Sequence, residues 1–257
     1  MELKDLQRNW DLLGKEDPLW AIITTDDKKG NKWDLGEFFA SGDREIAELM
    51  QYLSDLGLRC ARHRALDFGC GVGRLTQPLS RHFTNMIGVD IAPSMIAQAR
   101  ALDREGRCRF IVNDRADLSL FPDHEFDFIY CNIVLQHMRP VYSTGYIREF
   151  CRVLAPGGVS VFQVPSLCKL PPEPWSWKDA VRPLLPSPLL HWYRHRYRGL
   201  PVRQSETPQP GQMEMYTVPK PQVLKLVTRN GCRLIDAIEN ISSGPAYESW
   251  RYCVVKQ

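Results

Sequence analysis

Short apolar runs bounded by turn residues alternate along this chain with longer segments in which apolar residues return every third or fourth position. The short runs predict buried strands, and the periodic segments predict amphipathic helices. The predicted strands are 64–68, 86–90, 108–112, 126–131, 159–164, 232–238 and 250–256, and the predicted helices are 43–56, 73–82, 94–105, 140–154 and 220–230. This alternation predicts an α/β fold with a doubly wound, mostly parallel sheet.

The pattern divides the chain into four parts. Residues 1–60 form an N-terminal helical extension, and residues 61–164 hold the strand–helix units of the core. Residues 165–218 are an insertion after the fifth strand, rich in proline and aromatic residues and too long for a plain loop. Residues 219–257 supply a helix and two strands that complete the sheet. We expect the insertion to cap an acceptor pocket, and contact with a membrane surface is the alternative.

The segment Asp67-Phe68-Gly69-Cys70-Gly71-Val72-Gly73-Arg74 joins the first predicted strand to the following helix. Glycines in such a turn let a ligand approach the bare backbone, and the turn aims the free N–H groups of the helix N-terminus at that ligand. A dinucleotide-binding fingerprint requires a glycine where Arg74 stands, so the sequence does not match that motif.

This glycine segment resembles the first motif of the class I S-adenosylmethionine-dependent methyltransferases. Asp90 at the end of the second strand and the turn Leu154-Ala155-Pro156-Gly157-Gly158 resemble later motifs of the same family. The resemblance covers residues 43–164 well and residues 219–257 loosely, and it is nearest to small-molecule methyltransferases of the ubiquinone-biosynthesis type. It implies a Rossmann-like sheet of seven strands with the last antiparallel, and S-adenosylmethionine as the cofactor.

The resemblance also implies a set of cofactor-binding residues. Gly69 and Gly71 make room for the methionine part of the cofactor, and Asp67 lies near its amino group. Asp90 accepts hydrogen bonds from the ribose hydroxyls, with a helix-capping acid as the alternative. Ile91 and Met95 flank the adenine or ribose, and Asn132 lies next to the transferable methyl. Asp114 accepts from the adenine amino group, with Asp117 as its competitor. The backbone N–H groups of Arg115 and Ala116 reach the adenine ring.

His137 is the candidate general base, because it follows the predicted cofactor-facing loop and imidazole titrates near neutrality. The alternative is a structural histidine near the start of a helix. His191 and His195 in the insertion are rival candidates. We further expect residues 10–42 to fold across the cleft as a lid.

The lid hypothesis places Trp33, Phe38 or Phe39 near the ligand, and passive packing of these aromatic residues on a sheet edge is its alternative.

Transfer of a methyl group to oxygen, nitrogen or carbon of a small molecule is the leading functional hypothesis. The segment after the fourth strand lacks the Asn/Asp-Pro-Pro-Tyr/Phe motif of enzymes that methylate amino groups of bases or of glutamine. The net charge of +3 does not by itself indicate nucleic acid. The alternatives are a nucleic-acid or protein methyltransferase that uses the basic stretch 194–203, and a non-catalytic protein that binds S-adenosylmethionine.

The cysteine content indicates the cellular compartment of the protein. The eight cysteines form no Cys-x-x-Cys pair, which indicates a reduced, cytoplasmic protein with neither disulfides nor a metal site. The N-terminus does not resemble a signal peptide, and no apolar run approaches the length that spans a membrane.

Overall fold

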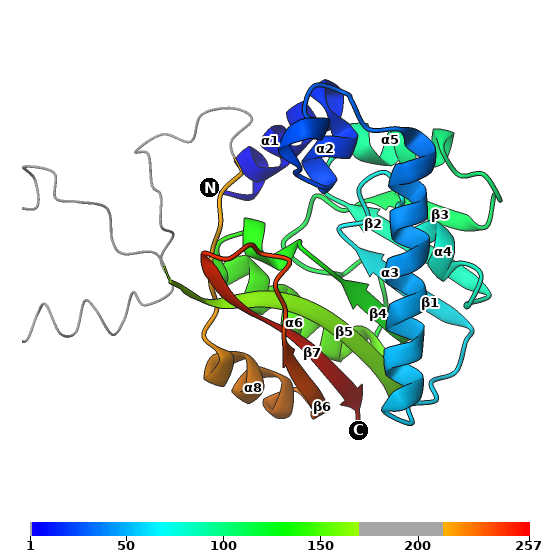
Figure 1. The fold of residues 1–257 in the computed structure, drawn as a ribbon. Helices are drawn as coiled ribbons and strands as arrows, with labels where there is room; N and C mark the ends of the chain where they lie inside the picture. Colours follow the sequence, from blue (N-terminus) through cyan, green and yellow to red (C-terminus); the bar gives the residue numbers. More distant parts are fainter. Residues whose placement is uncertain (1, 170–212) are drawn as a thin grey trace, which may run out of the picture.

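Seven strands form one sheet in the order β3-β2-β1-β4-β5-β7-β6 (Figure 1). The structure is a computed structural model and describes residues 2–169 and 213–257. Within these residues, β7 is antiparallel to both of its neighbours, and the other adjacent pairs are parallel. The predicted doubly wound sheet with an antiparallel last strand is therefore confirmed.

The bounds of the elements agree with the predicted order. The strands are β1 Arg64–Phe68, β2 Asn85–Asp90, β3 Cys108–Val112, β4 Phe126–Cys131, β5 Leu154–Cys168, β6 Cys232–Glu239 and β7 Tyr247–Lys256. The helices are α1 Leu3–Glu16, α2 Pro18–Ile22, α3 Leu35–Asp55, α4 Thr76–Leu79, α5 Pro93–Ala101, α6 Pro140–Val153 and α8 Lys220–Arg229, with short 3₁₀ turns at Asp26–Lys28 and Leu135–His137.

Several elements differ from the sequence prediction in their bounds. Helix α5 ends at Ala101 rather than at residue 105, β7 begins at Tyr247 rather than at residue 250, and β5 begins at Leu154, so the predicted turn 154–158 lies within it.

Helix α3 begins at Leu35 rather than at residue 43, because Asp34 caps it: the N–H of Glu37 donates to Asp34 Oδ1 at 2.8 Å. Helix α4 ends at Leu79, where the chain tightens into turns with bonds between residues three apart. Strand β5 continues past residue 164 to Cys168, because β7 pairs with it along that whole length.

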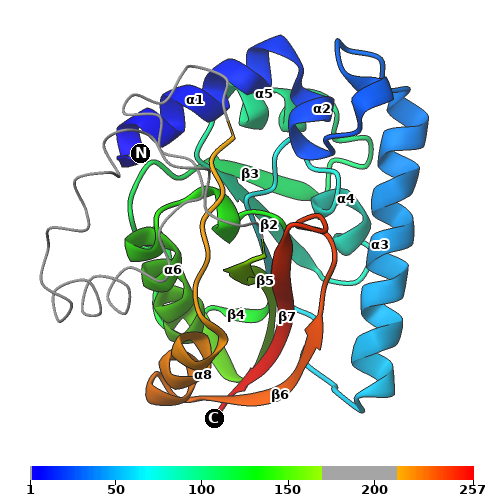
Figure 2. The same cartoon turned by 60° about the vertical axis from the view of Figure 1, so that its left-hand side comes forward.

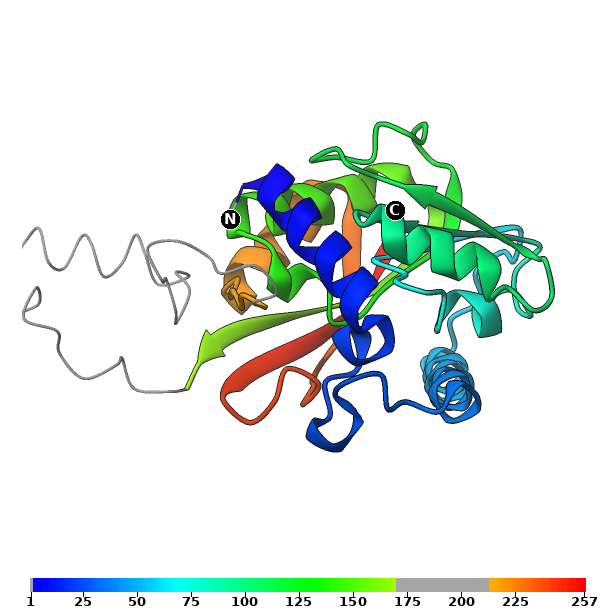
Figure 3. The same cartoon turned by 90° about the horizontal axis from the view of Figure 1, so that it is seen from above.

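Helices cover both faces of the sheet. On one face, Ile147 and Phe150 of α6 and Val223 of α8 pack with Ile129 and Phe162 of the sheet in one buried cluster. On the other face, α3 and α4 pack on the side chains that the sheet turns toward them: Ile46, Leu49, Leu53 and Leu79 meet Ala65, Phe128 and Val161. The carboxyl ends of the parallel strands lie under α1 and α2 (Figures 2 and 3).

Helix α1 is attached to α5 and to the end of β2 by side-chain hydrogen bonds. Gln7 Nε2 donates to the carbonyl of Ile91 at 3.1 Å, and the N–H of Ser94 donates to Asp11 Oδ1 at 2.8 Å. One turn further, Gln98 Nε2 donates to the carbonyl of Gly14 at 2.6 Å. These bonds fix α1 across the carboxyl ends of the strands, where Figure 3 shows it from above. Among the described helices, none has the length and apolarity to cross a bilayer.

Candidate functional site

A cleft lies at the carboxyl ends of β1, β2 and β4, beneath α1 and α2. Its walls include residues 67–71 after β1, residues 89–91 at the end of β2 and residues 132–134 after β4. The empty space at this cleft is about 1000 Å³, part of which is open solvent. In open α/β sheets this edge is where ligands bind.

The turn after β1 depends on two glycines. Gly69 has φ of 76° and Gly71 has φ of 52°, a conformation that side chains rarely adopt. A Cβ on Gly69 would lie 2.3 Å from Val134 Cγ2, and one on Gly71 would lie 2.5 Å from Ile22 Cδ1. Glycine therefore lets the turn lie directly against the chain after β4 and under the end of α2.

Asp90 joins this turn to the end of β2. The N–H of Gly71 donates to Asp90 Oδ2 at 2.9 Å, and the N–H of Ala92 donates to Asp90 Oδ1 at 2.9 Å. Burial raises the pKa of Asp90, and these backbone bonds oppose the rise. A carboxylate can accept about four hydrogen bonds, so Asp90 keeps acceptor capacity toward the cleft.

Asp67 is a second carboxylate at the glycine turn. It is buried, and the hydroxyl of Thr76 donates to its Oδ2 at 2.6 Å. Burial is the main cause that raises the pKa of Asp67 to about 7, and the bond from Thr76 and the charge of Arg74 act in the opposite direction. Near neutral pH a nearby positive charge would therefore shift the Asp67 carboxyl toward its ionised form.

A partly buried ion pair joins the glycine turn to α3 and β4. Arg74 Nη2 lies 2.7 Å from Glu45 Oε2, while Asn132 Nδ2 and the hydroxyl of Tyr130 donate to Glu45 Oε1 at 2.8 and 2.9 Å. A Cβ on Gly42 would lie 2.2 Å from the carbonyl oxygen of Arg74, so this glycine lets α3 approach closely enough for Glu45 to reach inward. Arg74 and Asn132 both line the cleft.

The sequence did not reveal Arg74 as a candidate ligand-binding cation. In the sequence it stood out only because it occupies a position where the dinucleotide-binding motif requires glycine. Arg74 is 5% exposed, and its Nε has no hydrogen-bond partner within the described residues. A buried, ion-paired cation with an unused donor at a cleft wall is suited to bind an anionic group. Glu45 gave no local signal, because its partners are distant in sequence.

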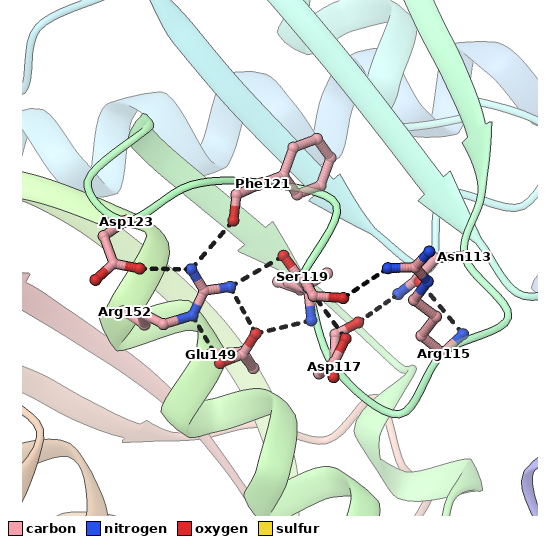
Figure 4. Close-up of polar contacts among 9 residues, drawn as sticks. Asn113, Arg115, Asp117, Ser119, Phe121, Asp123, Glu149 and Arg152 are labelled. Atoms are coloured by element: carbon pink, nitrogen blue, oxygen red, sulfur yellow. Dashed lines mark hydrogen bonds and ion pairs between the residues drawn. The ribbon is translucent and has the colours of Figure 1, made fainter.

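The predicted adenine-binding loop after β3 lies differently from expectation. Asp114, Arg115 and Ala116 are exposed and do not line the cleft, whereas the preceding Asn113 is buried and does. Figure 4 shows why: the loop closes on itself. Asn113 Nδ2 donates to the carbonyl of Asp117 at 3.0 Å, and Arg115 Nη1 donates to Ser119 Oγ at 2.9 Å.

Asp117, the competitor of Asp114, also binds within its own loop, where its Oδ1 accepts from the N–H of Ser119 at 3.0 Å.

Arg152 of α6 holds the rest of this connection in place (Figure 4). Its guanidinium donates to the carbonyls of Leu118 and Phe121 at 3.0 and 3.1 Å and pairs with Asp123 and Glu149. Glu149 in turn accepts from the N–H of Leu118 at 2.8 Å. The connection between β3 and β4 is therefore anchored to α6, and Asn113 stays at the cleft.

His137 lines the cleft, but both of its ring nitrogens are engaged. Nδ1 lies 2.9 Å from the carbonyl oxygen of Glu214, and Nε2 lies 3.2 Å from Gln136 Nε2. A carbonyl can only accept, so Nδ1 carries the proton and Nε2 accepts from the amide. Burial lowers the pKa of His137 to about 4. This environment favours the structural role for His137, while the rival residues 191 and 195 lie outside the described residues.

The N-terminal part covers the cleft with different residues from those expected. Trp10, Ala21 and Ile22 lie at the cleft, and so do Leu3 and Leu6, which precede the predicted lid. The expected aromatics pack away from it, in a cluster with Leu13, Val72, Ala92 and Met95: they are Trp33, Phe38 and Phe39. None of these three rings lines the cleft, although Met95 and Ala21 of the same cluster do.

The structure thus brings most of the predicted site residues together. Those that line the cleft are Asp67, Gly69, Gly71, Asp90, Ile91, Met95, Asn132 and His137. Among residues 2–169 and 213–257, no three His, Cys, Asp or Glu side chains gather as a metal site would require. The predicted cap, apart from 165–169 and 213–218, and the basic stretch 194–203 lie outside the described residues.

Comparison with known proteins assigns the domain. Residues 65–158 match the family model of the methyltransferase domain. The magnesium protoporphyrin IX methyltransferase of Synechocystis, solved with bound S-adenosylhomocysteine, superposes with a TM-score of 0.60 at 16% identity and covers 99% of each chain. Residues 65–158 therefore form a methyltransferase domain. The chain shares its fold with this S-adenosylhomocysteine-bound protein.

Curated relatives of this methyltransferase domain include small-molecule enzymes. A ubiquinone biosynthesis O-methyltransferase of Xanthomonas oryzae is 32% identical over 103 residues, which are 39% of this chain and 42% of that protein. A trans-aconitate 2-methyltransferase of Variovorax paradoxus is 36% identical over 104 residues, 40% of this chain and 38% of that protein. The chain therefore spans about two fifths of the length of these relatives.

Proposed function

We propose that this protein transfers a methyl group from S-adenosylmethionine to a small-molecule acceptor. The observation that carries the proposal is the hydrogen bond between the N–H of Gly71 and Asp90, which joins the glycine turn to an acceptor-rich carboxylate at the cleft. The match of residues 65–158 to the methyltransferase family supports the same assignment.

The residues at the cleft fit the parts of this cofactor. Asp90 is assigned to the ribose hydroxyls, because its oxygens keep acceptor capacity beside the backbone bonds. Ile91, Met95 and Asn113 are assigned to the adenosine, since they follow the ends of β2 and β3. Asp67 and Arg74 place one anion and one cation at the glycine turn, which suits the ammonium and carboxylate of an amino-acid group.

The chemistry needs few residues. When bound, S-adenosylmethionine supplies an activated methyl on its sulfonium. The protein has to align an acceptor with that methyl and exclude water. Residues 132–134 are assigned to alignment, and the apolar side chains of α1 and α2 to water exclusion. His137 remains a candidate base, although its two hydrogen bonds and low pKa favour support of the cleft wall.

Methyl transfer is tested by incubating the purified protein with methyl-labelled S-adenosylmethionine and a panel of phenols, carboxylic acids and amines, with an RNA mixture as a separate arm. Transfer to a small acceptor is expected. Transfer to RNA alone would favour the nucleic-acid alternative. Binding of S-adenosylhomocysteine with no transfer in any arm would favour the non-catalytic alternative.

Arg74→Met should weaken binding of S-adenosylhomocysteine by roughly tenfold, the scale of one charge-assisted hydrogen bond. The substitution removes the cation assigned to the ligand carboxylate but keeps most of the buried stem. Isothermal titration calorimetry gives the affinity. Arg81→Met is the matched control, because Arg81 pairs with Asp43 and Glu105 on the surface. Equal affinities in both variants would remove Arg74 from the site.

Affinity for S-adenosylhomocysteine should rise roughly tenfold between pH 6 and pH 7.5, because only the ionised carboxyl of Asp67 attracts the ligand ammonium. With a pKa of about 7, Asp67 is mostly protonated at the lower pH. Asp90 has a raised pKa and acts in the same direction, whereas His137, at about 4, stays neutral. Calorimetry across this range measures the effect, and Asp67→Asn should flatten it. An equally steep curve in that variant would contradict this role.

The free protein gives an independent check on Asp67. Its folded pKa of about 7 exceeds the ordinary value of 3.8, so the folded state binds more protons between these values. Stability should therefore fall as pH rises through that window and level off above it. Thermal unfolding of wild type and of Asp67→Asn, without ligand, measures this contribution.

Binding should also slow amide hydrogen exchange in α1 and α2. These helices contribute Leu3, Leu6, Trp10 and Ile22 to the cleft, so a bound ligand should reduce their local opening. Mass spectrometry would compare exchange in residues 3–22 with and without S-adenosylhomocysteine. Helix α8, which packs against α6 on the far side of the sheet, is the internal reference. Equal exchange in both states would remove the lid role from α1 and α2.

A further inference from the structure

Ile133 has an unusual backbone conformation at the wall of the cleft. Its φ is 58°, in the left-handed region that β-branched residues rarely enter. It directly follows Asn132, and both residues line the cleft. Strained residues of this kind persist only where the surroundings hold them, and they gather at functional sites.

The side chain of Gln163 holds this conformation. The N–H of Ile133 donates to Gln163 Oε1 at 3.1 Å. Parallel pairing between β4 and β5 has its last register pair at Cys131 and Phe162. Gln163 is the next residue on β5, so its side-chain carbonyl takes the place of the backbone partner that the turned chain has lost.

Gln163 is itself fixed from the opposite end. It is 1% exposed, and its Nε2 lies 2.7 Å from Ser243 Oγ and 2.5 Å from Ser249 Oγ. Ser243 Oγ also donates to Gln136 Oε1 at 2.8 Å, on the same loop as Ile133. Two other bonds determine which end of the amide faces Ile133. The N–H of Ile133 can only donate, and Gln136 Oε1, which lies 3.2 Å from Gln163 Nε2, can only accept, so the oxygen of Gln163 faces Ile133 and its nitrogen faces Gln136 and the serines.

Asn132 is restrained from the other side by α3. Its Nδ2 donates to Glu45 Oε1 at 2.8 Å. The two residues that follow β4 are therefore held by two polar side chains from different elements, Glu45 on α3 and Gln163 on β5. A relaxation of Ile133 to negative φ would rotate the peptide that joins it to Asn132, and with it the cleft wall.

We infer that Gln163 is a positioning residue that holds Ile133 in the left-handed conformation and thereby fixes the cleft wall at Asn132. The inference rests on the proposed function for its link to methyl transfer. Gln163 touches neither ligand nor acceptor in this role and acts through Ile133. The consequence is that its importance should depend on which residue occupies position 133.

The test is a set of four proteins: wild type, Gln163→Leu, Ile133→Gly, and the double variant. Glycine adopts the left-handed conformation without strain, so it does not require the support of Gln163. Thermal unfolding without ligand measures the effect on the fold. The Gln163→Leu substitution should lower the melting temperature more in the presence of Ile133 than in the Ile133→Gly background.

Affinity for S-adenosylhomocysteine measures the effect on the cleft. Gln163→Leu should weaken binding about tenfold in the Ile133 protein and less than about threefold in the Ile133→Gly background. Ser249→Ala is the matched control, because it removes a bond from Gln163 Nε2 and leaves Oε1 facing Ile133. Ser249→Ala should lower the melting temperature and change the affinity little. If the network had a merely structural role, Ser249→Ala and Gln163→Leu would lose affinity in proportion to their loss of stability.

Gln163→Glu keeps the accepting oxygen and should retain most of the affinity that Gln163→Leu loses. Equal losses from Gln163→Leu in both backgrounds, in melting temperature and in affinity, would overturn the inference. If wild type did not bind S-adenosylhomocysteine, the proposed function would fall, and the melting comparison would still decide whether Gln163 supports Ile133.

Discussion

Gly71→Val is expected to lower the affinity for S-adenosylhomocysteine by more than about 100-fold while the protein remains folded. Gly71 has φ of 52°, and its N–H is the donor to Asp90. A side chain would strain this backbone, displace the N–H and occupy the space beneath Ile22, whose Cδ1 would lie 2.5 Å from the new Cβ. Calorimetry measures the affinity, and circular dichroism measures the fold.

Gly57→Val is the matched control for Gly71→Val. Gly57 also has positive φ, 68°, but a Cβ there would meet no atom within 4 Å, and it follows α3 far from the glycine turn. Both substitutions strain a backbone with positive φ, and Gly71→Val adds the contact with Ile22, so it should lose more stability than Gly57→Val. Only Gly71→Val should lose the ligand, and normal binding by that variant would show that the glycine turn is not the ligand cradle.

Asp90→Ala is expected to weaken binding by about 1.5–3 kcal/mol, or roughly 10- to 150-fold. It removes the acceptor assigned to the ribose and also leaves the N–H groups of Gly71 and Ala92 without their partner. The loss should be larger for ligands that keep the ribose hydroxyls than for 2′-deoxy analogues. Calorimetry with S-adenosylhomocysteine and its 2′-deoxy form measures this difference.

Asp103→Ala is the control for Asp90→Ala. The carboxylate of Asp103 likewise accepts two backbone N–H bonds, from Gly106 and Cys108 at 3.1 and 3.2 Å, but at a surface turn. Its removal should reduce stability and leave affinity unchanged. If the two variants bound the ligand equally well, the carboxylate at the end of β2 would have no role in binding.

Local sequence patterns could predict the sheet and part of the cleft, because those features depend on neighbouring residues. The apolar runs identified each strand, and the alternating glycines identified a turn that needs positive φ. Asp90 could be placed because the end of a parallel strand is fixed once the strand is known.

The remaining features depend on contacts between residues far apart in the chain. Glu45 reaches Arg74 and Asn132 from α3, and Gln163 reaches Ile133 from β5. No periodicity or spacing reports such pairings. In the loop after β3, local spacing favoured Asp114 for the adenine, which stays a prediction, while Asn113 is the residue of this loop that lines the cleft.

The most direct test of the central claim is a calorimetric titration of the unmodified protein with S-adenosylhomocysteine at pH 7.5. Binding of one ligand per chain is expected, accompanied by a rise in melting temperature that grows with ligand concentration. Absence of both binding heat and thermal stabilisation at millimolar ligand would contradict the assignment of the cleft to this cofactor.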